Sequence, residues 1–191
     1  MKNILIFIIF ILGIILLKSF SNEQKDVISV KLNNQKEYLV LNYKDKYEAA
    51  SLLEDIRKNL MKLKNHLIKT YGSKVNNLKS RFTDSTEIIE SAPNPEYTSY
   101  TLNKGEKMVF CLRSLNDNTL HKKNTLMFVA IHELAHVLSD EIGHKDEFHK
   151  NFKFLLKEAI KINIYKNINY NKTPQNYCGM EINENPLIKI Q

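Results

Sequence analysis

The sequence contains one segment whose residue types and spacing are typical of metal chemistry, His132-Glu133-Leu134-Ala135-His136. In a helix, residues four positions apart lie one turn apart on the same face, so two imidazole rings can bind one ion. Two histidines at this spacing suit Zn²⁺, which takes ring nitrogens at about 2.0–2.1 Å. We therefore predict that His132 and His136 bind zinc. Glu133 then lies beside the ion, where it can act as general base toward a water molecule.

A catalytic zinc site needs a third protein ligand and one open position. Gly143 gives the backbone freedom to reverse direction at the end of the helix, and His144 follows it directly. We therefore predict His144 as the third ligand. Three other metal-binding side chains follow it and remain as alternatives: Glu147, His149 and Glu158.

The segment lies within an apolar helical pattern at residues 124–140, with Asn124 or Thr125 as a suitable N-cap. A buried helix of this kind would hold the two imidazole rings rigidly. A second, amphipathic helix is expected at residues 146–162, where bulky apolar residues recur at three- and four-residue spacing. The two helices would bring His144, which lies between them, close to the first pair.

The remaining elements are expected upstream of these helices. Residues 27–41 predict two short strands around a polar turn, and residues 45–71 predict one long amphipathic helix. Residues 73–95 have the composition of a loop. Residues 96–102 and 107–113 flank Asn-Lys-Gly and predict a hairpin. The last thirty residues show little periodicity.

The composition limits the class of protein. The chain has 191 residues, of which 43% are hydrophobic and 26% charged, enough for one domain with a buried core. Its net charge is +7, but only Arg57, Arg81 and Arg113 among its 28 basic residues are arginine, the residue that sequence-specific nucleic-acid readers favour. Nucleic acid is therefore a disfavoured partner. Cys111 and Cys178 are too few for a disulfide scaffold, and the sequence leaves open whether they pair or stay as buried thiols.

The amino terminus carries an apolar run at residues 4–17, flanked by Lys2 and Lys18. The run is shorter than the about 20 residues of a full bilayer span, but flanking lysines can extend its reach. We predict that residues 1–20 form a hydrophobic helix that acts as an uncleaved signal-anchor, and that residues 22–191 form a separate domain. The predicted localisation is a single-pass membrane protein, with cleavage and secretion as the alternative.

The motif and its surroundings resemble the WLM and SprT-like zinc metallopeptidases. Those families have HELxH, a few residues, and then His-x-x-x-Phe at the start of another helix. The resemblance implies that His132, His136 and His144 are zinc ligands, that Glu133 is the base, and that Phe148 packs against the site.

The resemblance covers about residues 107–160, and it has two departures. The connector before His144 is longer than is usual in WLM proteins, and His149 replaces the aromatic residue expected after Phe148. Most members of these families act on proteins crosslinked to DNA, a role that an N-terminal membrane segment does not suit. The combination is also similar to uncharacterised metallopeptidase-like proteins of large DNA viruses.

Two further features have alternative interpretations. The resemblance implies an edge strand at residues 107–113 with which a peptide substrate could pair, and the alternative is an ordinary core strand. Tyr177, or else Tyr170, could fold back and donate a hydrogen bond to a tetrahedral oxyanion, although aromatic residues in tails more often pack.

These observations predict a single α+β, zincin-like domain with a small mixed sheet, a backing helix and an active-site helix. The predicted function is zinc-dependent hydrolysis of peptide bonds in a protein or peptide substrate, by a membrane-tethered enzyme. One alternative is a non-catalytic, zinc-stabilised binding domain, which would have no use for Glu133. The other is a DNA-associated protease that repairs protein crosslinks.

Overall fold

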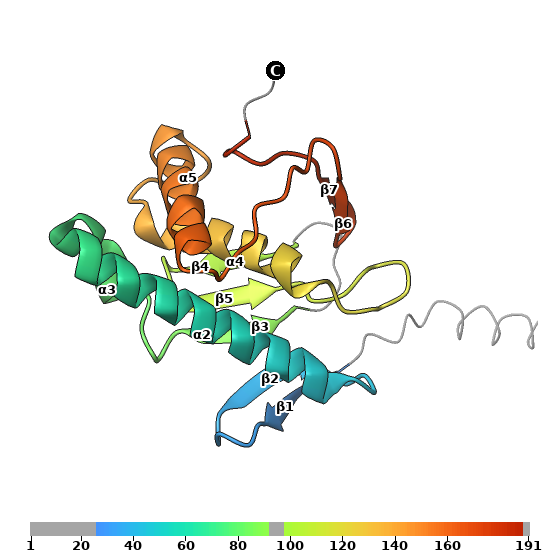
Figure 1. Cartoon of the computed structure of the whole chain (residues 1–191). Coiled ribbons are helices and arrows are strands. Elements are labelled where there is room, and N and C mark those ends of the chain that lie inside the picture. Colours follow the sequence, from blue (N-terminus) through green and yellow to red (C-terminus); the bar gives the residue numbers. More distant parts are fainter. Residues whose placement is uncertain (1–25, 92–97, 189–191) are drawn as a thin grey trace, which may run out of the picture.

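The computed structural model describes residues 26–91 and 98–188. Within them, a long helix runs along the domain with strands behind it and shorter helices beside it (Figure 1). The elements follow in this order: β1 (Val27–Lys31), β2 (Glu37–Leu41), α2 (Lys46–Tyr71), η1 (Gly72–Val75), α3 (Asn76–Arg81), β3 (Glu87–Glu90), β4 (Tyr100–Leu102), β5 (Lys107–Phe110), α4 (Lys123–Leu138), α5 (Asp146–Lys161), β6 (Gln175–Tyr177) and β7 (Met180–Ile182).

The described strands form three small sheets. β1 pairs with β2 and β6 pairs with β7, both antiparallel, while the third sheet has the order β3-β5-β4. In that sheet β5 runs parallel to β3 and antiparallel to β4, so Met108 pairs with Ile88 on one side and Thr101 on the other. The predicted small mixed sheet and the hairpin that ends at β5 are both confirmed.

Of the two interpretations left open for residues 107–113, the edge strand is wrong. β5 occupies the centre of its sheet, and its side chains from Met108 to Phe110 are buried. The alternative of a core strand therefore holds, because a strand between two partners has no free edge. β4 lies at one edge of this sheet and contacts α4.

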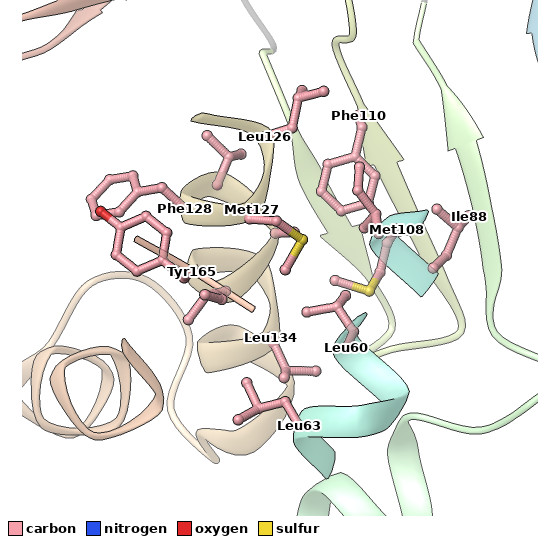
Figure 2. Close-up of a cluster of buried hydrophobic side chains, with 14 of the residues drawn as sticks. Leu60, Leu63, Ile88, Met108, Phe110, Leu126, Met127, Phe128, Leu134 and Tyr165 are labelled. Atoms are coloured by element: carbon pink, nitrogen blue, oxygen red, sulfur yellow. The ribbon is translucent and has the colours of Figure 1, made fainter. Parts of the chain in front are cut away.

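The core lies between α2, α4 and the β3-β5-β4 sheet. The apolar face of α2 recurs at three- and four-residue spacing and is fully buried, as the amphipathic pattern predicts, at Leu53, Ile56, Leu60, Leu63 and Leu67. Figure 2 shows side chains from the three elements meeting in one cluster, which includes Leu60, Leu63, Met108, Phe110 and Leu134. The predicted backing helix is confirmed as α2, and α4 is buried along most of its length.

Two segments have more structure than the sequence predicts. The segment predicted as a loop contains η1, α3 and β3, and the C-terminal tail contains the β6–β7 hairpin. α3 has six residues and β6 and β7 have three each, too few for a periodic pattern to be visible.

The predicted single-pass membrane localisation is not supported by the helices that the structure describes. None of its helices is long and apolar enough to cross a bilayer. α2 has 26 residues, the length of a span, but lysines and acidic residues occupy its outer face. The apolar run at residues 4–17, the basis for the predicted hydrophobic helix and anchor, lies outside the described residues. The membrane assignment is withdrawn.

Gly105 is expected to be a sensitive position in the turn between β4 and β5. Its φ is +118°, and a Cβ there would lie 2.7 Å from the carbonyl oxygen of Arg81 and 3.1 Å from Val137 Cγ1. We expect Gly105→Ala to lower the free energy of unfolding in urea by about 2 kcal/mol or more, because backbone strain and overlap add. Gly143→Ala is the matched control, since Gly143 has a φ of +82° in open space. An equal loss in both variants would show that the overlap does not matter.

Candidate metal centre

Three histidines converge in the cleft beside α4. His132 and His136 lie one turn apart on α4, and His144 comes from the loop that follows the helix. One ring nitrogen from each lies within 4.8 Å of the other two. The Nε2 atoms of His132 and His144 are 3.0 Å apart. The structure therefore brings together all three residues that the sequence predicts as ligands.

This donor set suits a divalent cation. Burial, with the neighbouring imidazoles, lowers the pKa of His132 to about 3 and that of His136 to about 4, and burial also lowers the pKa of His144. All three rings are therefore neutral at pH 7, with lone pairs available for an ion. Nitrogens around a tetrahedral zinc ion lie about 3.3 Å from one another, close to the observed separation of the His132 and His144 nitrogens.

Packing from α5 holds the imidazole rings in place. The ring of Phe148 stacks on His136 with centroids 4.4 Å apart, and it contacts the edges of His132 at 4.8 Å and His144 at 4.6 Å. Phe148 is 2% exposed. The packing role that the resemblance implies for Phe148 is confirmed by these contacts.

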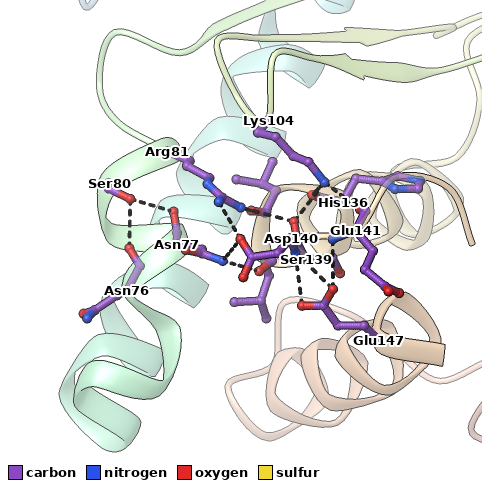
Figure 3. A network of polar contacts seen from close by, with 12 residues as sticks. Asn76, Asn77, Ser80, Arg81, Lys104, His136, Ser139, Asp140, Glu141 and Glu147 are labelled. Atoms are coloured by element: carbon purple, nitrogen blue, oxygen red, sulfur yellow. Dashed lines mark hydrogen bonds and ion pairs between the residues drawn. The ribbon is translucent and has the colours of Figure 1, made fainter. Parts of the chain in front are cut away.

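A polar network surrounds the C-terminal end of α4 (Figure 3). The last carbonyl groups of a helix lack partners within it. Arg81 donates to the carbonyl oxygens of Val137 and Ser139, and Asn77 donates to that of Leu138. Lys104 donates to the carbonyl oxygen of Ser139 at 2.9 Å. Two cationic side chains at a helix C-terminus also interact favourably with its dipole, so this end is firmly fixed.

Glu147, one alternative third ligand, binds backbone groups of this loop instead. Its carboxylate accepts hydrogen bonds from the N–H groups of Asp140 and Glu141, at 3.1 and 3.0 Å (Figure 3). The acidic residue at the start of α5 therefore holds the loop that carries His144.

The other two alternatives also lie apart from the histidine cluster. Glu158 is buried between α2 and α5, where it binds His66 Nε2 at 2.9 Å and the ammonium group of Lys161. His149 is exposed on α5 and lines the cleft without joining the cluster.

Glu133 lies next to the histidines and faces the cleft. Its side chain is 4% exposed, and burial raises its pKa to about 7. Its Oε2 accepts a hydrogen bond from Thr101 Oγ1 at 2.8 Å. A buried carboxylate with few donors around it is a strong proton acceptor.

The cleft has a volume of about 1100 Å³ and lies between α4, β4 and the C-terminal tail. Tyr177 lies in its wall, with its hydroxyl 2.6 Å from Ser99 Oγ. Tyr170, the alternative, packs against Phe128 with centroids 4.9 Å apart and does not line the cleft.

The open question about the cysteines is answered by the structure. Cys111, after β5, and Cys178, in the β6–β7 turn, form a disulfide across 67 residues. It fixes the tail that carries Tyr177 to the central sheet.

Sequence analysis missed the polar residues in and next to β4, chiefly Ser99, Thr101 and Lys104. The hairpin pattern around them is visible in the sequence, and it indicates which residues share a face. No local pattern shows that this face meets α4, because the two segments are 32 residues apart.

The fold is similar to that of a solved structure, a Wss1 mutant from Saccharomyces cerevisiae. The TM-score is 0.50 with 19% sequence identity, and the match covers 64% of this chain and 86% of that chain. At this identity the similarity concerns the fold alone, and it agrees with the predicted arrangement of small sheets and helices.

The sequence relatives are viral. No protein-family model matches the chain. It is 45% identical over 85 residues to uncharacterized protein 042R of Invertebrate iridescent virus 3, covering 43% of this chain and 50% of that protein. It is 36% identical over 194 residues to uncharacterized protein R325 of Acanthamoeba polyphaga mimivirus, covering 97% of this chain and 96% of that protein. The predicted similarity to uncharacterised viral proteins is thus confirmed, and the chain belongs to the family of this mimivirus protein.

Proposed function

We propose that this protein is a zinc-dependent metallopeptidase whose catalytic domain comprises residues 22–191. The observation that carries the proposal is the convergence of three neutral histidines beside a buried glutamate in one cleft. His132, His136 and His144 would hold the ion. A zinc ion bound there supplies a Lewis acid that acidifies water and polarises a carbonyl group.

Glu133 is the general base in this proposal. Its position beside the histidines lets it take the proton of the attacking water and return it to the leaving amine. Its burial supports this role, because a carboxylate shielded from bulk water holds a proton more readily than an exposed one. A purely structural metal site would need no such group.

Tyr177 is the proposed donor to the tetrahedral oxyanion. Ser99 Oγ accepts a hydrogen bond from the backbone N–H of Cys111 at 3.1 Å, so its own proton is available for the oxygen of Tyr177. The phenol proton is then free to point into the cleft. Burial raises the pKa of Tyr177, so the hydroxyl keeps its proton as a donor must.

The substrate class follows from the resemblance and the fold together. The HELAH segment resembles WLM metallopeptidases and the fold is similar to that of Wss1, which supports a protein substrate. The same similarity favours a second candidate, a DNA-associated protease that acts on crosslinked proteins. A higher cleavage rate for a DNA-crosslinked protein than for the same protein free would distinguish this second candidate.

We expect the purified protein to bind about one equivalent of zinc after dialysis, as atomic absorption would measure. His132→Ala and His136→Ala should each abolish stoichiometric binding, because two ligands do not hold zinc stably. His149→Ala is the matched control, since this histidine is exposed and outside the cluster. Full zinc content in both cluster variants would refute the metal site, and zinc without peptide cleavage would favour the non-catalytic binding domain.

A further inference from the structure

The side chains of β4 divide between solvent and the active-site helix. Tyr100 and Leu102 are 36% and 44% exposed. Alternate residues of a strand point to opposite faces, so Thr101 points to the other face, and Ser99 lies directly before the strand begins. Both hydroxyls are hydrogen-bonded to candidate catalytic groups, Ser99 to Tyr177 and Thr101 to Glu133. This part of the chain therefore contacts two candidate catalytic side chains directly.

The bond between Thr101 and Glu133 joins the sheet to the helix. Thr101 Oγ1 lies 2.8 Å from Glu133 Oε2 and 3.5 Å from the backbone oxygen of Glu133. A hydroxyl has one proton, and the shorter distance and the carboxylate acceptor assign that proton to Oε2. Within the described residues, no other hydrogen bond to this carboxylate is observed.

The hydrogen bond from Thr101 to Oε2 fixes the direction in which the Glu133 carboxylate points. It limits rotation of the carboxylate about its last torsion, which is broad and weakly restrained in an isolated glutamate. With Oε2 bound to Thr101, Oε1 is left to accept a proton in the cleft. The bond also ties Glu133 to β4, which is held in the sheet by antiparallel pairing with β5, where Thr101 pairs with Met108.

We propose that Thr101 is a positioning residue for Glu133, whose hydroxyl orients the carboxylate for proton transfer. This inference rests on the proposed metallopeptidase function. It concerns a threonine that neither the zinc motif nor the resemblance includes. Because the effect is on orientation, it acts on the chemical step rather than on binding of the peptide.

The test compares three variants at Thr101 in the full-length, zinc-loaded protein. Thr101→Val keeps the shape but removes the donor, and we expect kcat for a fluorogenic peptide to fall about tenfold to a hundredfold with KM unchanged. Thr101→Ser restores the hydroxyl and should recover kcat to within about threefold of wild type. Thr101→Ala, which adds no atoms, provides the same comparison if the valine variant folds poorly.

Thr119→Val is the matched control. Thr119 Oγ1 also donates to a carboxylate at 2.8 Å, that of Asp117, but in an exposed loop outside the cleft. This variant should have wild-type kcat. Zinc content and melting temperature, measured for every variant, separate a loss of positioning from a loss of the site or the fold.

The outcomes separate this inference from the proposed function. If the wild type cleaves and Thr101→Val keeps full kcat, or Thr101→Ser is as slow as Thr101→Val, the positioning role is wrong and the metallopeptidase remains. A change in KM alone would likewise overturn it. If the zinc-loaded wild type cleaves no peptide or protein, the proposed function fails and the role of Thr101 fails with it.

Discussion

Glu133→Gln is expected to lower peptide hydrolysis by about 10²–10⁴-fold while zinc content and melting temperature stay at wild-type values. Glutamine has the shape of glutamate, and its amide oxygen can still accept the hydrogen bond from Thr101. It cannot accept a proton from water. The reduction would be measured as kcat/KM on one peptide substrate for both proteins.

Glu87→Gln is the matched control for this variant. Glu87 is 57% exposed on β3, where it pairs with Lys107, and it does not line the cleft. Its activity should equal that of wild type. Undiminished hydrolysis by Glu133→Gln would refute the proposed general base, and loss of zinc would make Glu133 a ligand or a structural partner of the ion.

His144→Ala is expected to weaken zinc binding more than about 100-fold. This loss is larger than the one caused by removing a residue that only hydrogen-bonds to a metal ligand. Two histidines remain on α4, and they occupy only half of a tetrahedral coordination sphere. The dissociation constant would be measured by competition with a chromophoric chelator.

The three alternative ligands serve as comparisons for His144→Ala. Glu147→Ala should weaken zinc binding by about tenfold, because its carboxylate holds the loop that carries His144. Glu158→Ala and His149→Ala should leave the dissociation constant unchanged, since neither side chain joins the cluster. Normal binding by His144→Ala together with a large loss in one of these variants would move the third ligand to that residue.

The long elements were predictable from periodicity alone. α2, α4 and α5 match the predicted helices within two residues at each end, because each is long enough to repeat its apolar pattern several times. β1 and β2 also fall within the predicted pair of strands. In these segments the local pattern and the tertiary environment favour the same structure.

Short elements and strand order were not predictable. β3 has four residues, two of them buried, and its identity as a strand depends on pairing with β5. The central place of β5 follows from that same parallel pairing, which joins segments separated by β4. No local property of residues 107–113 could reveal a partner on each side.

The candidate site likewise has residues that were predictable from the sequence and contacts that were not. Spacing alone indicates His132, Glu133 and His136, and Gly143 marks the turn that leads to His144. The environment of Glu133 was not predictable, because Thr101 comes from another element of the fold. Sequence identifies groups by their order along a helix, whereas their partners depend on tertiary packing.

The disulfide between Cys111 and Cys178 makes a closed covalent ring of the chain between them. That ring contains all of α4 and α5, and so all three histidines of the cluster. Its most accessible stretch is the exposed loop at residues 140–146. A single cut in this loop before His144 would place the histidines of α4 on one peptide and His144 on another. The disulfide would hold the two peptides together until a reducing agent cleaved it. Cleavage of the loop alone would therefore not separate His144 from the two histidines of α4.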